Sequence, residues 1–281
     1  MGQYHVIANL DKRMGFSPRS TGDFVKLMEF GQGSAAMCAL VTLLDGAWHG
    51  ERIAIVGDYA QSDDLDAENT LRAGISAEHL YTAINHPERL AAEHGVKPAW
   101  RNVGWLARKA TTTAGLATYE KKSYDLVNRQ QGTKTTHHFY ESAMAPDTDT
   151  EPRVIVNLDE REKIDPAEFG DDRRAGVFAV TGGRGGTLTA LAVLLAVSST
   201  DGGRGGGDFR GESCPVGAWG GARIGLLHPD EAADYTDLSE MMRVGMSEAR
   251  EGIYRRRDDG LIERGDRWKD NPWESPIRGV A

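Results

Sequence analysis

The sequence predicts an α/β (or α+β) protein built by internal duplication into two homologous lobes, and three observations support this. In each half an apolar, β-branched run leads through a glycine-rich segment to a helix-like stretch and a further apolar run. The order strand, glycine loop, helix, strand is typical of α/β proteins. The same segments recur in the same order in the second half, and 40% hydrophobic residues suffice to bury a core.

The recurrence is clearest at the start of each half. "HVIANLDKRMGFSPRSTGD" at residues 5–23 aligns without a gap with "RVIVNLDEREKIDPAEFGD" at residues 153–171. Later, "GAWHGERIAIV" aligns with "GAWGGARIGLL", which places Trp48 on Trp219. We therefore predict a first copy with an irregular α+β extension at residues 1–146 and a second copy at residues 152–281, ending in a helix and an Arg- and Trp-containing tail. The Pro- and Asp-containing "APDTDTEP" reads as the link between them.

Each predicted lobe has the pattern strand, strand, glycine loop, helix, strand. The first strand ends at an aspartate, Asp11 or Asp159, and a turn marked by proline follows. In the first copy the remaining predicted elements are a second strand at 24–30, a helix at 34–44 and a buried strand at 52–58. In the second copy the corresponding elements are a strand at 175–180, a helix at 187–197 and a buried strand at 222–227.

Three other stretches have a clear period. Residues 76–95 read as helix interrupted at Pro87, and residues 133–142 alternate as an antiparallel strand does. Residues 237–254 show one apolar helical face that includes Leu238 and Met242. On the predicted strand His137 and His138 would point to opposite faces, so they are not a joint metal pair.

The glycine loops are the first candidate site, because a glycine loop that enters a helix lets backbone N–H groups approach an anion. The second copy adds the insertion "SSTDGGRGGGDFRGE", whose arginines suit phosphate or carboxylate. The predicted ligand-binding residues are Gly182, Gly183, Arg184, Gly185, Gly186, Thr187, Arg204, Asp208 and Arg210. The pattern is neither a P-loop nor a complete dinucleotide motif, and glycines also serve tight turns and close packing.

Clustered carboxylates give a second candidate site. Asp58, Asp63 and Asp64 follow the predicted strand of the first copy, and such groups can hold magnesium, the one cofactor the sequence suggests. The alternative is a solvated loop in which Asp or Ser caps the next helix. Asp11 and Asp159 are candidates for hydrogen bonds to turn backbone, and Trp48 and Trp219 for matching core positions.

Composition narrows the class of partner. A net charge of -9 and a pI near 5.4 argue against binding to a nucleic-acid backbone or an anionic membrane. Two cysteines, Cys38 and Cys214, give no disulfide framework, and the start "MGQYHVIANL" lacks the features of a secretion signal. We expect a cytoplasmic protein that does not enter a membrane, with homo-oligomers possible.

The opening "MGQYHVIANLDKR", with "GGRGGTLTALAVLLAV", "GGRGGGDFR" and "RIAIVGDYA", resembles a set of uncharacterised proteins encoded by phages and actinobacteria. The resemblance covers both duplicated cores. It implies that Asn9, Asp11, Asp58 and the glycine loops belong to a recurring design, and it carries over no catalytic residue. It also implies a phage-associated role, in the host cytoplasm if the protein is phage-encoded.

The sequence favours a binding protein for an anionic small molecule, a nucleotide or a phosphorylated metabolite, at the glycine-rich loops. The first alternative is a non-enzymatic structural or interaction protein whose glycine loop orders on meeting a protein partner. The second is a magnesium-dependent enzyme that uses the carboxylates after the first lobe's strand. Whether the protein is an enzyme stays open at this point.

Overall fold

The structure is a computed structural model of the 281-residue chain. It describes residues 3–22, 25–27, 35–95, 99–113, 117–128, 133–144, 153–165, 190–197, 215–245, 254–256 and 262–264. Its helices and strands follow in the order β1 (His5–Asn9), β2 (Met14–Phe16), η1 (Pro18–Thr21), α1 (Ala35–Leu44), β3 (Glu51–Gly57), α2 (Ala67–Ala73), α3 (Ala77–Asn85), α4 (Pro87–His94), β4 (Arg101–Asn102), α5 (Gly104–Thr113), β5 (Ala117–Asn128), β6 (Thr133–Met144), β7 (Val154–Asn157), β8 (Glu162–Ile164), α6 (Ala190–Leu195), β9 (Arg223–Leu227), η5 (Pro229–Ala232), β10 (Thr236–Asp237), β11 (Tyr254–Arg256) and β12 (Ile262–Arg264).

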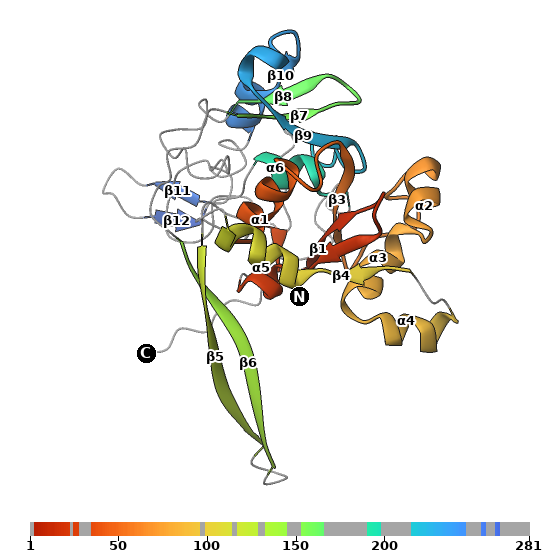
Figure 1. The fold of residues 1–281 in the computed structure, drawn as a ribbon, viewed down its shortest axis with the longest axis vertical. Helices are drawn as coiled ribbons and strands as arrows, with labels where there is room; N and C mark the ends of the chain where they lie inside the picture. Colours follow the sequence, from red (N-terminus) through yellow and green to blue (C-terminus); the bar gives the residue numbers. More distant parts are fainter. Residues whose placement is uncertain are drawn as a thin grey trace.

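A mixed α/β arrangement is organised around one eight-stranded sheet, in the order β10-β8-β7-β9-β3-β1-β2-β4. Neighbouring strands are antiparallel except at its two ends, where β10 runs parallel to β8 and β4 parallel to β2. Strands from both halves of the chain meet at the centre, where β3 pairs with β9 and Arg52 lies opposite Arg223. Figure 1 shows this sheet with α1 and α6 beside it and the β5–β6 hairpin extending away from the body.

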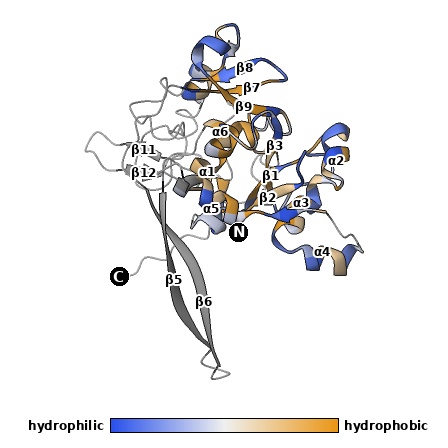
Figure 2. Cartoon of the chain, viewed as in Figure 1, coloured by the Kyte–Doolittle hydropathy of each residue, from blue (hydrophilic) through white to orange (hydrophobic). Residues whose placement is uncertain are grey.

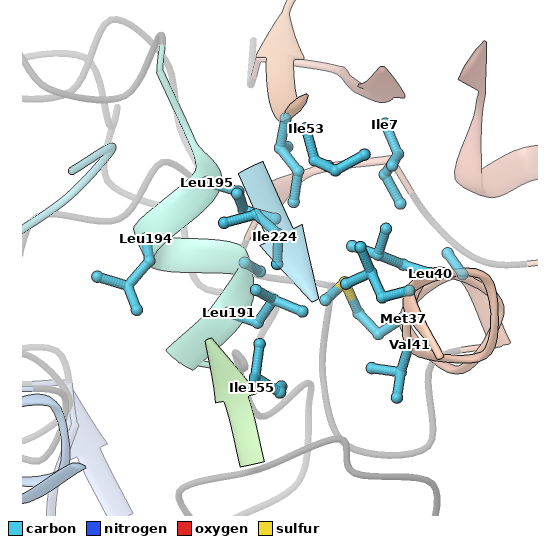
Figure 3. Close-up of a cluster of buried hydrophobic side chains, with 14 of the residues drawn as sticks. Ile7, Met37, Leu40, Val41, Ile53, Ile155, Leu191, Leu194, Leu195 and Ile224 are labelled. Atoms are coloured by element: carbon cyan, nitrogen blue, oxygen red, sulfur yellow. The ribbon is translucent and has the colours of Figure 1, made fainter. Parts of the chain in front are cut away.

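Strands β1 and β3 alternate between two hydrophobic cores, as the two-residue period of a strand requires. On one face Ile7, Ile53 and Ile55 pack with α1 and α6, and the close-up of this core is Figure 3. On the other face Val6, Ala8 and Val56 pack with residues of α2, α3 and α4. Figure 2 shows the division in colour: α1 and α6 are largely hydrophobic, whereas much of α2 and α4 is hydrophilic. Most residues of α2 and α4 are exposed.

Residues that align between the two halves of the sequence make matching backbone hydrogen bonds. Leu10 N donates to Arg52 O and Leu158 N to Arg223 O, both at 2.9 Å. Across the central strand pair, Gly50 N donates to Ile224 O at 2.9 Å and Gly221 N to Ile53 O at 2.8 Å. Trp48 N donates to Leu43 O, as Trp219 N does to Leu194 O. The sheet order is symmetric as well. From one end the strands follow in the order β4, β2, β1, β3, and from the other end in the order β10, β8, β7, β9.

The turns after β1 and β7 have a common construction. Asn9 Oδ1 accepts from Lys12 N at 2.9 Å, and Asn157 Oδ1 accepts from Glu160 N at 3.2 Å. Arg13 and Arg161, which align in sequence, both adopt the left-handed conformation, with φ of 50° and 54°. These turns reverse the chain directly into β2 and β8, so each first strand forms a hairpin.

One part of the sequence prediction needs correction. The second strand of each lobe is β2 or β8, which lies in the stretch predicted as the proline-marked turn. Residues 25–27 of the predicted 24–30 strand are described and are not in a strand. The other predicted strand, 175–180, lies outside the described residues. The predicted α/β (or α+β) class holds in its coarse form, since the fold is mixed α/β and its sheet is mostly antiparallel. The tight turns at Arg13 and Arg161 make the β1–β2 and β7–β8 pairs antiparallel, because a parallel partner needs a longer crossover.

Other predicted elements are confirmed. The break at Pro87 separates α3 from α4, with Pro87 in the first turn of α4, and the alternating stretch at 133–142 lies in β6. Residues 239–245 are helical, with Leu238 and Met242 buried. The predicted helices appear as α1 and α6, although residues 34 and 187–189 lie outside the described part. The predicted domain link at 145–152 lies outside it too, so both domain ranges stay a prediction.

Among the described residues no helix is long and apolar enough to cross a membrane.

Candidate functional site

One edge of the sheet, where β1 begins and β3 ends, gathers polar side chains from four elements. We call Tyr4, Arg19, Asp58, Tyr81 and Asn85 the edge cluster. Tyr4 immediately precedes β1, Arg19 lies in η1, Asp58 follows β3, and α3 supplies the other two. Because β1 and β3 are antiparallel, the start of one and the end of the other meet at the same edge.

Backbone pairing fixes Asp58 beside Tyr4. Asp58 N donates to Tyr4 O at 2.8 Å, and Tyr4 N donates to Asp58 Oδ1 at 2.9 Å. This pair of hydrogen bonds extends the β1–β3 ladder by one step through a side chain. Asp58 makes no ion pair with any described residue, so its carboxyl group is positioned without a neutralising cation.

Arg19 is held by an aromatic ring. Its guanidinium carbon lies 5.5 Å from the centroid of the Tyr4 ring, within the range of a cation–π interaction. Ser17 caps η1 by accepting from Arg19 N, which fixes the backbone from which the side chain extends. Arg19 forms no ion pair with a carboxylate in the described part of the chain, and its guanidinium is exposed to solvent.

Tyr81 and Asn85 complete the cluster one helical turn apart on α3. The Asn85 amide is near enough to the Tyr81 hydroxyl to favour its ionised form, yet Asn85 Nδ2 makes no well-formed hydrogen bond with any described residue although it is buried. A buried donor without a partner is costly. Asn85 therefore offers a hydrogen-bond donor at the edge of the sheet.

Burial shifts two proton-binding groups of the cluster in the same direction. Burial raises the pKa of Asp58, and the hydrogen bonds from the Tyr4 and Asp58 backbone oppose this. Burial also raises the pKa of Tyr81, and the negative charge of Asp58 adds to the effect. Arg19 acts on Tyr81 in the opposite direction, so Tyr81 lies within the electrostatic reach of both charged groups. Groups perturbed by burial gather at functional sites more often than elsewhere.

Behind the edge cluster, on the α1 face of the same strands, lie Gln3 and His5. Both are fully buried, and burial lowers the pKa of His5 to about 4, so its imidazole is neutral at pH 7. The Gln3 amide packs on Gly57, where an added Cβ would approach Gln3 Nε2 to 2.1 Å. Neither polar atom of that amide has a hydrogen-bond partner among the described residues. Gly57 is therefore required for this packing, because any side chain there would displace Gln3.

A second group of charges has a different character. It lies where the two halves meet, and we call it the central ion network: Asp11, Arg52, Glu68, Arg72, Asp159 and Arg223. Arg52 Nη1 donates to Asp159 Oδ2 at 2.8 Å, which links the two halves. Asp11 Oδ2 accepts from Arg52 N, and Asp159 Oδ2 from Arg223 N. These aspartates thus bond to the neighbouring strand, whereas Asn9 and Asn157 bond to turn backbone.

The two groups of residues differ in whether they repeat. In the central ion network Asp11 aligns with Asp159 and Arg52 with Arg223, while the buried Trp48 and Trp219 occupy matching core positions as predicted. At the edge cluster Arg19 aligns with Ala167 and Asp58 with Pro229, so the second half lacks these groups. Repeated residues here hold the sheet together, and the unrepeated edge cluster is the candidate for a specialised role.

The structure tests the predicted site residues unequally. The glycine and arginine residues at 182–187 and 204–210 lie outside the described residues, as does Cys214, while Cys38 is buried in α1. Of the predicted magnesium ligands, Asp58 accepts from Tyr4 N and Asp64 from Gln61 N. Asp58, Asp63 and Asp64 all lie in the described part of the chain, and no group of three or more His, Cys, Asp or Glu side chains suited to a metal occurs there, so the structure does not bring these three carboxylates together as a metal site.

The capping alternative for that acidic stretch is confirmed at one residue. Asp66 is the N-cap of α2 and accepts from Asn69 N at 2.7 Å. Sequence reasoning missed Tyr4, Arg19, Tyr81 and Asn85. Their only sequence signal was polar residues near strand ends, which is common, and their meeting depends on contacts between distant segments.

Comparison with protein-family models, with curated proteins and with solved structures finds no match to this chain.

Proposed function

We propose that the two halves of the chain arose by duplication and that only the first half kept or acquired the edge cluster. The gapless alignment of residues 5–23 with 153–171 supports this, together with the matching hydrogen bonds around the central strand pair. In this proposal the repeated residues form a common scaffold. The residues that break the repeat then mark where one half became specialised.

We further propose that the protein binds an anionic small molecule, a nucleotide or a phosphorylated metabolite, and that the edge cluster contributes to its binding. The observation that carries this is Arg19: a solvent-exposed guanidinium held over the Tyr4 ring, with no carboxylate partner in the described part of the chain. A planar guanidinium binds phosphate or carboxylate through two parallel hydrogen bonds, and prior fixing of the side chain reduces the entropy lost on binding.

Two further features suit the same ligand class. Asn85 Nδ2 is buried and makes no well-formed hydrogen bond with a described residue, so an oxygen of the ligand would satisfy it. Helix α1, whose first turn begins at Ala35, packs against η1, the element that carries Arg19. The predicted glycine loop directly precedes that turn in the sequence. A positive helix end there would favour negative charge.

Thermal denaturation with a panel of nucleotides and sugar phosphates, each with and without magnesium, tests the proposal. A ligand present at a hundred times its dissociation constant adds about 2.7 kcal/mol to the free energy of unfolding. Arg19→Gln is expected to weaken binding of the active compound by about 1.5–3 kcal/mol, because a charged hydrogen bond is lost. The matched control is Arg101→Gln, which removes an exposed arginine of β4 and should leave binding unchanged. Equal binding by both variants contradicts the role of Arg19.

The second-half loops enter the same experiment as separate variants. If they hold the anion, Gly186→Val abolishes binding by crowding it, and Arg204→Ala weakens binding by about 1.5–3 kcal/mol. If these variants bind normally while Arg19→Gln does not, the site belongs to the first half alone. If every variant and the wild type fail to respond to the whole panel, the anion-binding function is wrong.

A second candidate function, that of an interaction or assembly protein, has one specific observation in its favour. Strands β5 and β6 pair along all twelve residues of each, from Ala117 opposite Met144 to Asn128 opposite Thr133, as a sheet of two strands. The hairpin extends from the body in Figure 1. An isolated two-stranded hairpin is only marginally stable, and its outer edges are templates for further pairing.

Replacing residues 117–144 by a short Gly-Ser linker tests this candidate. If the hairpin mediates self-association, the wild type is a dimer or larger by light scattering and the shortened chain is a monomer. Circular dichroism must show that the shortened chain is folded. If the wild type is a monomer, or if the shortened chain still associates, the hairpin does not mediate self-association.

A further inference from the structure

The edge cluster contains one cation and one carboxyl group that do not pair with each other. Arg19 and Asp58 both contact Tyr4, Arg19 at its ring and Asp58 at its backbone N–H, and they act on the ionisation of Tyr81 in opposite directions. Neither makes an ion pair with a described residue. Opposite charges attract each other, so two that contact the same residue without forming an ion pair are each available to a ligand.

Their own contacts hold them apart. Asp58 is fixed by the Tyr4 backbone N–H at 2.9 Å, and Arg19 lies over the Tyr4 ring with its guanidinium carbon 5.5 Å from the centroid. One residue thus positions the carboxyl group through its backbone and the guanidinium through its side chain. The separated charges are features of the folded chain and require no ligand to arrange them.

We propose that the ligand of the edge cluster is zwitterionic: a phosphate or carboxylate group that binds Arg19, joined to an amino group that binds Asp58. This rests on the proposed anion-binding function and names the class of ligand more closely. A ligand with negative charge alone would bring like charge toward Asp58, and one with positive charge alone would bring it toward Arg19. A molecule with one of each satisfies both groups, and an oxygen of its anionic end is available to Asn85 Nδ2, which makes no well-formed hydrogen bond within the described part of the chain.

The test uses alkyl phosphates in pairs, each with and without a terminal amino group, over a series of increasing chain length. Calorimetry on the wild-type protein is expected to show that at least one aminoalkyl phosphate binds about tenfold tighter than its amine-free partner. The alkyl chain length at which the amino group increases the affinity most reports the distance between Arg19 and Asp58. A tenfold difference corresponds to about 1.4 kcal/mol.

The variant Asp58→Asn distinguishes binding of the amino group by Asp58 from a structural role of Asp58, because asparagine still presents an oxygen to Tyr4 N. In that variant the amine-containing and amine-free compounds should bind equally, with amine-free binding at least as tight as in the wild type. Arg19→Gln should weaken both members of every pair. Glu88→Gln, an exposed carboxylate in the first turn of α4, is the matched control and should retain the full advantage of the amine.

The possible failures are distinct. If amine-free phosphates bind through Arg19 but an amino group adds nothing at any length, the zwitterion inference is wrong and the anion-binding proposal stands. If Asp58→Asn keeps the advantage of the amine, Asp58 is not its partner and the inference is again wrong. If no compound of the series or of the nucleotide panel binds the wild type, both proposals are wrong.

Discussion

Replacing Trp219 by alanine is expected to lower the free energy of unfolding by about 3–5 kcal/mol, the usual cost of removing a large aromatic side chain from a core. Trp219 is fully buried within the core that joins α1, α6 and the strands of both halves. Its indole Nε1 also donates to Glu162 Oε2 at 2.6 Å, which links the approach to β9 with β8. The substitution therefore removes packing and leaves a carboxylate without its donor.

Urea denaturation of two further variants tests how much of this loss in the free energy of unfolding comes from the hydrogen bond and whether it depends on burial. Trp219→Phe keeps most of the apolar volume and loses the hydrogen bond to Glu162, so about 1.5–3 kcal/mol of the loss should remain. Trp105→Ala is the matched control: that side chain is 60% exposed on α5, and its removal should change stability by about 0.5 kcal/mol or less. Comparable losses for Trp219→Ala and Trp105→Ala would mean that Trp219 is not a core residue.

Asp159→Asn is expected to destabilise the protein by about 2 kcal/mol near neutral pH, within the range for hydrogen bonds to charged groups. Asp159 accepts from Arg223 N at 3.0 Å, from Arg223 Nε at 2.6 Å and from Arg52 Nη1 at 2.8 Å. The side chain of Arg52 is only 15% exposed. Without the Asp159 charge, the Arg52 guanidinium keeps Glu68 as its only carboxylate partner among the described residues.

The effect of Asp159→Asn should depend on pH in a defined direction. Burial alone would raise the pKa of Asp159, but the hydrogen bonds from Arg223 and the charges of Arg52 and Arg223 outweigh it, so the pKa is lowered. A carboxyl group with a lowered folded-state pKa stabilises the fold above its unfolded-state pKa, about 3.9 for Asp. That contribution disappears as the pH falls through the folded-state value. The gap between wild type and variant should be constant from about pH 5 to 8 and should close below about pH 4.

Asp234→Asn is the control for this experiment. Asp234 pairs with Arg161, and their side chains are 71% and 56% exposed, so solvent screens the pair. Its loss should change stability by about 1 kcal/mol or less. A gap for Asp159→Asn that stays constant below pH 4, or one no larger than that for Asp234→Asn, would show that the central ion network does not stabilise the contact between the halves.

The sequence was a good guide wherever a local pattern decides the local structure. The apolar runs that become β1, β3, β7 and β9 were predicted as strands, because a buried strand is a short continuous apolar stretch. The break between α3 and α4 was predicted because proline lacks an N–H and cannot continue a helix. For Trp48 and Trp219, alignment of the two halves was enough to predict matching buried positions.

The short strands β2 and β8 could not be predicted in the same way. Each has three residues, and "EKI" in β8 has no apolar run. Their strand conformation comes from pairing with β1 and β7 after turns in which Arg13 and Arg161 take a left-handed conformation. Arginine has no particular preference for that conformation, so nothing in the composition of the turn announces the hairpin.

The sequence by itself determined the apolar strands, the helices with their break at Pro87, and the repeated pattern of the two halves, because backbone propensity and side-chain period act between neighbours in the chain. Only the tertiary structure decided that the sheet is mostly antiparallel and that its two halves meet through Arg52 and Asp159. It also decided that Arg19 lies over the Tyr4 ring and that Asp58 accepts from Tyr4 N, although Asp58 makes no ion pair within the described part of the chain. These contacts join segments far apart in sequence, and their free energy depends on distance, burial and partner, none of which is a property of a local stretch.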